Sequence, residues 1–275
     1  MSQKLQLLKA YAAPATYTDA ALDAVDLAHA RELWRHHRIT HGFAATVPPL
    51  IAAPDSNAKL DKSTTPTYGL SLAPHRLAAV GNVCPHSTPQ CRELCLASAG
   101  KGRFGSVQRG RQVRTTFLAA HPLEFRAMMR DELQRTLHKY GRRHLAFRPN
   151  VLSDLPWERE PWLDALPARL HVYGYTKRPS AVSACGRVDM TFSISERQRT
   201  FDEAEQILEQ GTRVAVVTAA ELPKTFRGWP VIDGDKSDER WKDPVGIVLL
   251  RPKGKARDIE PTLRGFVKPA EWFAA

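Results

Sequence analysis

Short apolar segments alternate with longer amphipathic segments along this sequence, and the alternation constrains the fold more than any other feature. Residues 121–141 and 200–211 have apolar side chains at helical spacing, and each segment ends at a glycine. Strands that alternate with helices favour a parallel sheet with right-handed crossovers. We therefore predict an α/β protein with a TIM-like or partial (β/α) barrel, and an open doubly wound sheet is the alternative. The segments typical of strands are "TYGLSLA", "HLAFRPNVL", "LHVYGYT", "DMTFSIS", "RVAVVTA", "WPVID" and "GIVLL".

The first part of the chain has a different character. Residues 19–37 have the apolar spacing of an amphipathic helix. The next segment, 42–67, is rich in Pro, Ala, Ser and Thr, which is typical of a long loop. We therefore expect an N-terminal helical lobe and linker over residues 1–56. A barrel-like domain that contains a cysteine-rich loop is expected over residues 57–275.

The charge of the chain points to a polyanionic partner. Lys and Arg number 40 against 29 Asp and Glu, which gives a net charge of +11. Such an excess favours nucleic acid, and we expect DNA. A solvent-exposed helix face is the alternative role for the basic side chains. Five of them follow the cysteine-rich loop in one acid-free segment: Lys101, Arg103, Arg109, Arg111 and Arg114.

The sequence also bears on the compartment. It contains no apolar run of about eighteen residues, so we predict no membrane span. The N-terminal segment lacks the apolar centre of a signal peptide. We therefore expect a cytoplasmic protein, and a reducing cytoplasm disfavours a structural disulfide.

Three of the four cysteines lie within the short segment "CPHSTPQCRELC". Clustered thiols in a reducing compartment more often bind metal or perform redox chemistry than form disulfides. Cys84, Cys91 and Cys95 can hold three corners of an iron–sulfur cluster, or bind zinc together with a nearby histidine. Cys185 is a candidate fourth ligand in either case. Buried, unreactive thiols are the alternative.

Catalytic side chains are expected at the carboxyl ends of the strands, where βα folds place their reactive groups. Asp154 follows an apolar strand and is the candidate acid or base, although a helix-capping role is also open. Tyr173 and Tyr175 alternate along a strand and therefore share one face, either to stack on an aromatic ring or as core residues. The candidates are Asp154, Tyr175 and Lys177 for catalysis, and Asn150, Ser153, Tyr173 and Ser195 for cofactor binding.

Several longer motifs resemble one family of proteins. The segments "NVCPHSTPQCRELCLA", "NVLSDLPWE", "VYGYTK", "FSISER" and "VIDGDKSDERWKDP" look like those of an uncharacterised bacteriophage three-cysteine family, sometimes called gene product eighty-eight. The resemblance runs from Asn57 to the C-terminus and implies a phage origin and a single domain. Less closely, the cysteine-rich loop is similar to the cluster loop of radical S-adenosylmethionine enzymes, which space their cysteines more tightly. That similarity implies a 4Fe–4S cluster with one iron open to S-adenosylmethionine.

Three functional hypotheses follow. The first is a phage metal-cluster enzyme, iron–sulfur and similar to radical S-adenosylmethionine enzymes, that modifies nucleic acid or a nucleotide. The second is a zinc-containing enzyme similar to base-exchange transglycosylases that acts on DNA, with Asp154 or an aspartate of "DGDKSDER" as nucleophile. The third is a non-enzymatic, metal-stabilised protein that binds nucleic acid.

Overall fold

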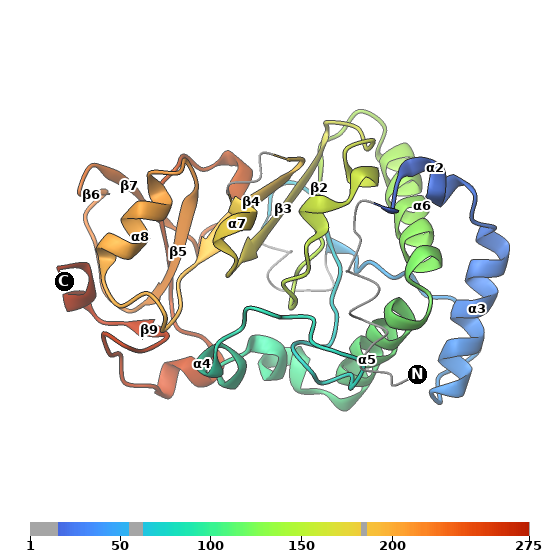
Figure 1. Ribbon diagram of the computed structural model, residues 1–275, viewed down its shortest axis with the longest axis horizontal. Helices are drawn as coiled ribbons and strands as arrows, with labels where there is room; N and C mark the ends of the chain where they lie inside the picture. The colour runs from blue at the N-terminus through green and yellow to red at the C-terminus, as the bar shows by residue number, and fades with distance from the viewer. Residues whose placement is uncertain (1–15, 55–62, 183–185, 275) are drawn as a thin grey trace.

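The computed structural model describes residues 16–54, 63–182 and 186–274, and a nine-stranded sheet forms its centre (Figure 1). The strands lie in the order β1-β2-β3-β4-β5-β8-β7-β6, and β9 pairs with β5. The strands span β1 Thr67–Gly69, β2 Leu145–Arg148, β3 Leu170–Thr176, β4 Val188–Ser193, β5 Arg213–Thr218, β6 Thr225–Phe226, β7 Trp229–Asp233, β8 Ile247–Leu250 and β9 Val267–Lys268.

The order of the strands explains why the sheet stays open. The first five strands are parallel and adjacent in chain order, as in a partial (β/α) barrel. Beyond β5 this succession breaks, because β8 pairs between β5 and β7, and β6 folds back antiparallel on β7. The α/β prediction is therefore confirmed. A complete TIM-like barrel is wrong, since β1 and β6 form opposite edges of the sheet.

Helices lie mainly at one end and in the crossovers. The predicted helix over residues 19–37 is two helices, because the Asp26 carboxylate accepts hydrogen bonds from the backbone N–H groups of Ala28 and His29 and starts a new helix there. The helical elements are α2 Asp19–Asp23, α3 Leu27–Thr40, α4 Pro89–Glu93, α5 Gly105–Ala120, α6 Pro122–Tyr140, α7 Pro179–Val182 and α8 Phe201–Leu208, with single 3₁₀ turns η3 Leu96–Ser98, η4 Gly100–Arg103, η5 Trp157–Arg159, η6 Pro161–Leu163, η7 Arg240–Lys242, η8 Gly254–Asp258 and η9 Ala270–Phe273.

The N-terminal helices share their core with the sheet. Figure 1 shows α2 and α3 beside α6 at one end of the molecule. Leu22 and Trp34 are buried in the same apolar cluster as Phe147 of β2. The predicted boundary between residues 56 and 57 lies outside the described residues, so it stays a prediction.

The two faces of the sheet differ in chemistry, because successive side chains of a strand point to opposite faces. On one face, Phe147 and Val172 belong to the apolar cluster that includes α6. On the other, strand register aligns Tyr175 with Thr191 and Thr191 with Arg213. This second face is lined by polar and charged side chains that are nevertheless largely buried.

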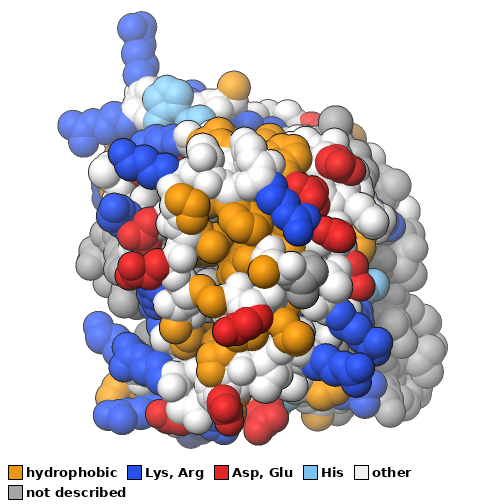
Figure 2. Space-filling model, turned by 90° about the vertical axis from the view of Figure 1, so that its left-hand side faces the viewer, with side chains coloured by type: hydrophobic (Ala, Val, Ile, Leu, Met, Phe, Trp, Pro, Cys, Tyr) orange, Lys and Arg blue, Asp and Glu red, His pale blue; other side chains and the backbone are white. Residues whose placement is uncertain are grey.

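The end of the molecule that carries β6, β7 and α8 exposes hydrophobic side chains. Figure 2 shows hydrophobic side chains forming a patch down the middle of this end, bordered by charged groups. No helix in the described parts of the chain is long and apolar enough to cross a membrane. The half-buried hydrophobic residues of the underlying core are Val182, Ala220, Leu222, Phe226, Trp229, Val231 and Val245.

Candidate functional site

The cysteine loop, residues 84–95, lies at the carboxyl ends of the parallel strands. In Figure 1 the chain around α4 runs along the side of the sheet toward which β3 and β4 point. Glu196, just after β4, accepts hydrogen bonds from the Thr88 hydroxyl at 2.6 Å and from the Gln90 backbone N–H at 2.9 Å. On the other side, the Asp154 backbone N–H donates to the Val83 carbonyl at 2.8 Å. The loop is therefore fixed to the segments that follow β2 and β4.

The three thiols of this loop are free and half-buried. Cys84 Sγ accepts from the His75 backbone N–H at 3.3 Å and donates to the Leu152 carbonyl at 3.4 Å. Burial raises the pKa of Cys84 to about 12. Electrostatic interactions connect Cys84 with both Cys91 and Cys95, and Cys91 with Cys95, so the three thiols lie in one neighbourhood.

The thiols do not form a finished ligand set. Over residues 16–54, 63–182 and 186–274, no three His, Cys, Asp or Glu side chains are arranged to hold a metal ion. Cys185, the candidate fourth ligand, lies outside the described residues. Binding a metal would therefore require the thiols to turn toward a common centre.

Two cations interact with these thiols. The Lys177 ammonium, which interacts electrostatically with Cys91, donates to the Ser193 carbonyl at 3.1 Å and hydroxyl at 3.0 Å, and to the Ile194 carbonyl at 3.2 Å. Arg111 of α5 interacts with Cys95, and its buried Nε has no hydrogen-bond partner among the described residues. Burial lowers the pKa of both cations. Positive charge held here would offset the negative charge of thiolates.

Asp154 is buried beside the cysteine loop and connects it to β3. Its Oδ1 accepts from the Thr176 hydroxyl at 2.8 Å, and its Oδ2 accepts from the Lys177 backbone N–H at 3.1 Å. Arg178 Nε lies 3.5 Å from Oδ1, and the same guanidinium pairs with Glu158 at 2.6 Å. These contacts hold the end of β3 in place, which is a positioning role.

Asn150 and Ser153 lie in the same loop as Asp154 and bond to one another. Asn150 Oδ1 accepts from the Ser153 hydroxyl at 2.7 Å and from the Leu155 backbone N–H at 3.1 Å, and its Nδ2 donates to the Leu155 carbonyl at 2.9 Å. Ser195 is buried after β4, where its hydroxyl lies 3.2 Å from Gln198 Oε1. The structure brings all three near the cysteine loop, yet their polar groups have local partners.

Tyr173 and Tyr175 share one face of β3, as predicted, and both hydroxyls donate to Asp238, at 2.8 and 3.1 Å. Burial, reinforced by the Asp238 charge, raises the pKa of both tyrosines. Arg148 pairs with the same carboxylate at 2.5 Å and lies 4.8 Å from the centre of the Tyr175 ring. Trp241 packs against Tyr173 at 4.9 Å. These contacts favour the core interpretation of both tyrosines, and ring stacking with a ligand stays a prediction.

The predicted basic segment does not form one surface. Lys101, Arg103 and Arg109 are exposed, whereas Arg111 and Arg114 are half-buried on α5. Arg114 Nη1 donates to the Ser71 carbonyl at 3.2 Å, and burial lowers its pKa to about 10. Contact with phosphate is thus open to three of the five cations, and the other two point toward the cysteine loop and the segment after β1.

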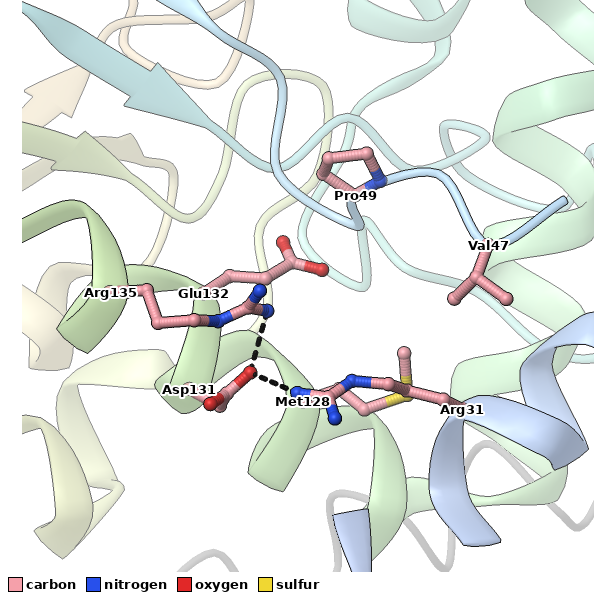
Figure 3. A pocket seen from close by; sticks show the side chains of 7 residues that line it. All are labelled: Arg31, Val47, Pro49, Met128, Asp131, Glu132 and Arg135. Carbon is pink, nitrogen blue, oxygen red and sulfur yellow. Dashed lines mark hydrogen bonds and ion pairs between the residues drawn. The ribbon is translucent and has the colours of Figure 1, made fainter. Parts of the chain in front are cut away.

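A cavity of about 270 Å³ lies elsewhere, between α3, α6 and residues 47–49 (Figure 3). Figure 3 shows Arg31 and Arg135 approaching Asp131 from two sides, with N–O distances of 2.8 and 2.6 Å. Glu132 accepts from the backbone N–H groups of Leu50 and Ile51, and burial raises its pKa to about 7. None of the residues predicted for catalysis, cofactor or metal binding lines this cavity.

Comparison with known proteins supplies one decisive match. Residues 49–264 match the family model described as Gene product 88. The chain belongs to this family. No curated protein and no solved structure matches the sequence. The matched region of this Gene product 88 protein includes the whole cysteine loop and strands β1 to β8, and α2 and α3 precede it.

The sequence prediction missed three residues around the cysteine loop of this Gene product 88 protein. Glu196 directly follows a predicted strand. The expectation that reactive groups lie at the carboxyl ends of strands therefore indicates it. Lys268 is buried, its ammonium donates to the Leu263 carbonyl at 3.2 Å, and burial lowers its pKa to about 8. The Phe266 backbone N–H donates to Gln90 Oε1 at 2.7 Å, and the Lys177 ammonium lies 4.9 Å from its ring. Both residues come from the end of the chain, where no local pattern indicates them.

Proposed function

We propose that this protein is an enzyme that holds a metal cluster on Cys84, Cys91 and Cys95 and modifies nucleic acid or a nucleotide. The observation that carries the proposal is the placement of three free thiols in one loop that is fixed to the segments after β2 and β4, with Lys177 and Arg111 close enough to interact electrostatically. The position of the cysteine loop, at the carboxyl edge of a parallel sheet, adds support because βα folds place reactive groups there.

An iron–sulfur cluster suits this donor set better than zinc. Three thiolates hold three corners of such a cluster, whereas a structural zinc site takes four protein ligands. When bound, the cluster supplies one-electron chemistry, and S-adenosylmethionine is the proposed co-substrate by resemblance alone.

The side chains around the cluster have separate roles in this proposal. Lys177 and Arg111 balance the charge of the thiolates. Asp154 positions Lys177 through the Lys177 backbone N–H, so its substitution acts through Lys177. The nucleic acid would approach from the exposed side of the cysteine loop, where Lys101 and Arg103 lie.

The test is metal analysis of protein purified without oxygen. We expect iron and sulfide, with the broad brown absorbance of an iron–sulfur cluster, and we expect both to be lost in Cys84→Ser, Cys91→Ser and Cys95→Ser variants. Cys185→Ser should retain the cluster. Stoichiometric zinc that also depends on Cys185 would favour the zinc enzyme, and protein without any metal would refute the proposal.

One observation favours a second candidate, a metal-stabilised nucleic-acid-binding protein without catalytic activity. The Asp154 carboxylate is used in contacts to Thr176, Lys177 and Arg178, which is a structural use of the proposed acid or base. Asp154→Asn separates the two candidates. DNA binding that falls with salt and persists in this variant, with no turnover of S-adenosylmethionine by the wild type, supports the binding protein.

A further inference from the structure

Two segments that are far apart in the sequence meet beside the cysteine loop. The turn η8 packs against η3, and a β-carbon placed on Gly254 would lie 3.2 Å from the β-carbon of Ala99. Ala256 of η8 is buried together with Leu94 of the cysteine loop and Val267 of β9. Figure 1 shows the C-terminal segment passing close to α4. The surface around the thiols is therefore built from both η4 and the segment after β8.

This composite surface is rich in exposed cations. Lys101 and Arg103 lie in η4, and Lys255 and Arg257 lie in η8. In the described part of the chain, none of the four forms an ion pair, whereas Asp258 and Glu260 are the nearest acids in sequence. Residues 94–123 contain no Asp or Glu at all. The part of the surface built by η4 therefore carries positive charge without a neighbouring acid in the sequence.

Two large apolar side chains close to these turns in the sequence are also exposed. Phe104 is 53% exposed and Leu263 is 43% exposed. The Arg103 guanidinium carbon lies 5.7 Å from the centre of the Phe104 ring. An exposed aromatic ring flanked by cations matches a ligand with both phosphates and accessible base faces. We call this set of exposed residues the rim: Lys101, Arg103, Phe104, Lys255, Arg257 and Leu263.

We propose that the rim binds single-stranded nucleic acid, with the four cations on phosphates and Phe104 stacked on a base. In a duplex the base faces are stacked on one another, so Phe104 would have no partner and only the cations would bind. The inference rests on the proposed function in one respect, which is that the bound strand is taken to be the substrate. The location of the rim beside the thiols would bring a bound strand to the proposed metal centre.

The experiment is fluorescence anisotropy with a labelled oligonucleotide of about 20 nucleotides, single-stranded and as a duplex, over a range of salt concentrations. We expect tighter binding of the single strand. Lys101→Glu with Arg103→Glu, and Lys255→Glu with Arg257→Glu, should each weaken binding and reduce the slope of log K against log salt by roughly 1.4. Phe104→Ala should weaken single-strand binding about tenfold without changing this slope.

Arg142→Glu with Arg143→Glu is the matched control. Both residues are exposed between α6 and β2, at the amino end of the sheet, and the double variant changes the net charge by the same amount. An equal loss in this control would overturn the assignment to the rim, as would equal affinity for the duplex or an unchanged Phe104→Ala variant. Preferential binding of poly-glutamate or anionic vesicles would instead assign the rim to an acidic protein or a membrane surface and refute the proposal.

A protein that lacks all three cysteines separates this inference from the proposed function. The triple serine variant should bind the single strand as the wild type does, with its folding verified by thermal unfolding. Rim-dependent binding by a wild type that contains no metal would refute the metal-cluster enzyme and keep the inference. A wild type that contains metal but does not bind the single strand through the rim would refute this inference and leave the proposed function standing.

Discussion

Two polar clusters on the same sheet differ in how their charges are partnered. We compare the Asp238 cluster, which is Asp238 with Arg148, Tyr173 and Tyr175, and the cysteine cluster, which is the three thiols with Lys177 and Arg111. In the first, one carboxylate receives two hydroxyl groups and one guanidinium. In the second, the thiols share no direct bond with either cation, and the buried Nε of Arg111 lacks a hydrogen-bond partner within the described residues.

The difference separates a polar network that stabilises the fold from one whose polar groups are incompletely satisfied within the described residues. A buried network whose members are all satisfied makes the sheet rigid, and removing one member leaves another charge uncompensated. A buried donor without a partner costs free energy of folding, and the Nε of Arg111 is one of several such atoms among the described residues. Two substitutions test this contrast, and a third tests Lys268, whose charge interacts with that of Lys177 in the cysteine cluster.

Arg148→Met should cause the largest loss in the free energy of unfolding. Removing the guanidinium leaves the largely buried Asp238 carboxylate without its paired cation, which costs about 3–5 kcal/mol in comparable cases. Urea unfolding of the variant and the wild type measures the loss. Asp238→Leu added to Arg148→Met should restore part of the stability, and a loss below about 1 kcal/mol for the single variant would show that the Asp238 cluster is not structural.

Lys268→Met should have an intermediate effect on the free energy of unfolding, and this effect should depend on pH. Burial lowers its pKa from 10.5 to about 8. Between these two values the unfolded chain binds more protons than the folded chain, so the free energy of unfolding rises with pH in that window. We expect a gain of about 2 kcal/mol between pH 7 and pH 10 in the wild type, relative to Lys268→Met. If the free energy of unfolding changed with pH in the same way in the wild type and in Lys268→Met, this expectation would be contradicted.

Arg111→Met should have the smallest effect on stability. Its Nη1 donates to the Ala97 carbonyl at 3.0 Å, and losing one such bond costs about 1 kcal/mol. Unfolding of chelator-treated protein measures this loss, and metal content after anaerobic purification should fall in the same variant. A destabilisation as large as that of Arg148→Met would remove the distinction between the two clusters.

Local patterns in the sequence were enough to predict the elements that frame the site. The strand predicted from "LHVYGYT" is β3 over the same residues, and α6 ends before Gly141, whose φ of 59° favours glycine. The alternation of apolar residues along a strand and the glycine at the end of a helix are properties of neighbouring residues. They are therefore visible without knowledge of the fold.

The parts that could not be predicted depend on contacts between distant residues. The sheet stays open because β8 pairs with both β5 and β7, and no local pattern specifies that pairing. Asp238 lies in a motif that is typical of a polar turn, yet its ion-pair and hydrogen-bond partners come from β2 and β3. The thiols were found from their spacing, whereas Lys268 and Phe266 come to the cysteine loop from the final segment of the chain, where no local pattern indicates them.

That final segment has a consequence for synthesis. Phe266, Val267 and Ala256 cover the cysteine loop, and the ribosome makes them long after Cys95 has emerged. At ordinary rates of translation, of about 5–20 residues per second, the growing chain exposes its thiols for on the order of ten seconds before the cover exists. During that interval the thiols are open to any metal ion or oxidant in their surroundings, whereas in the folded protein the final segment covers their loop.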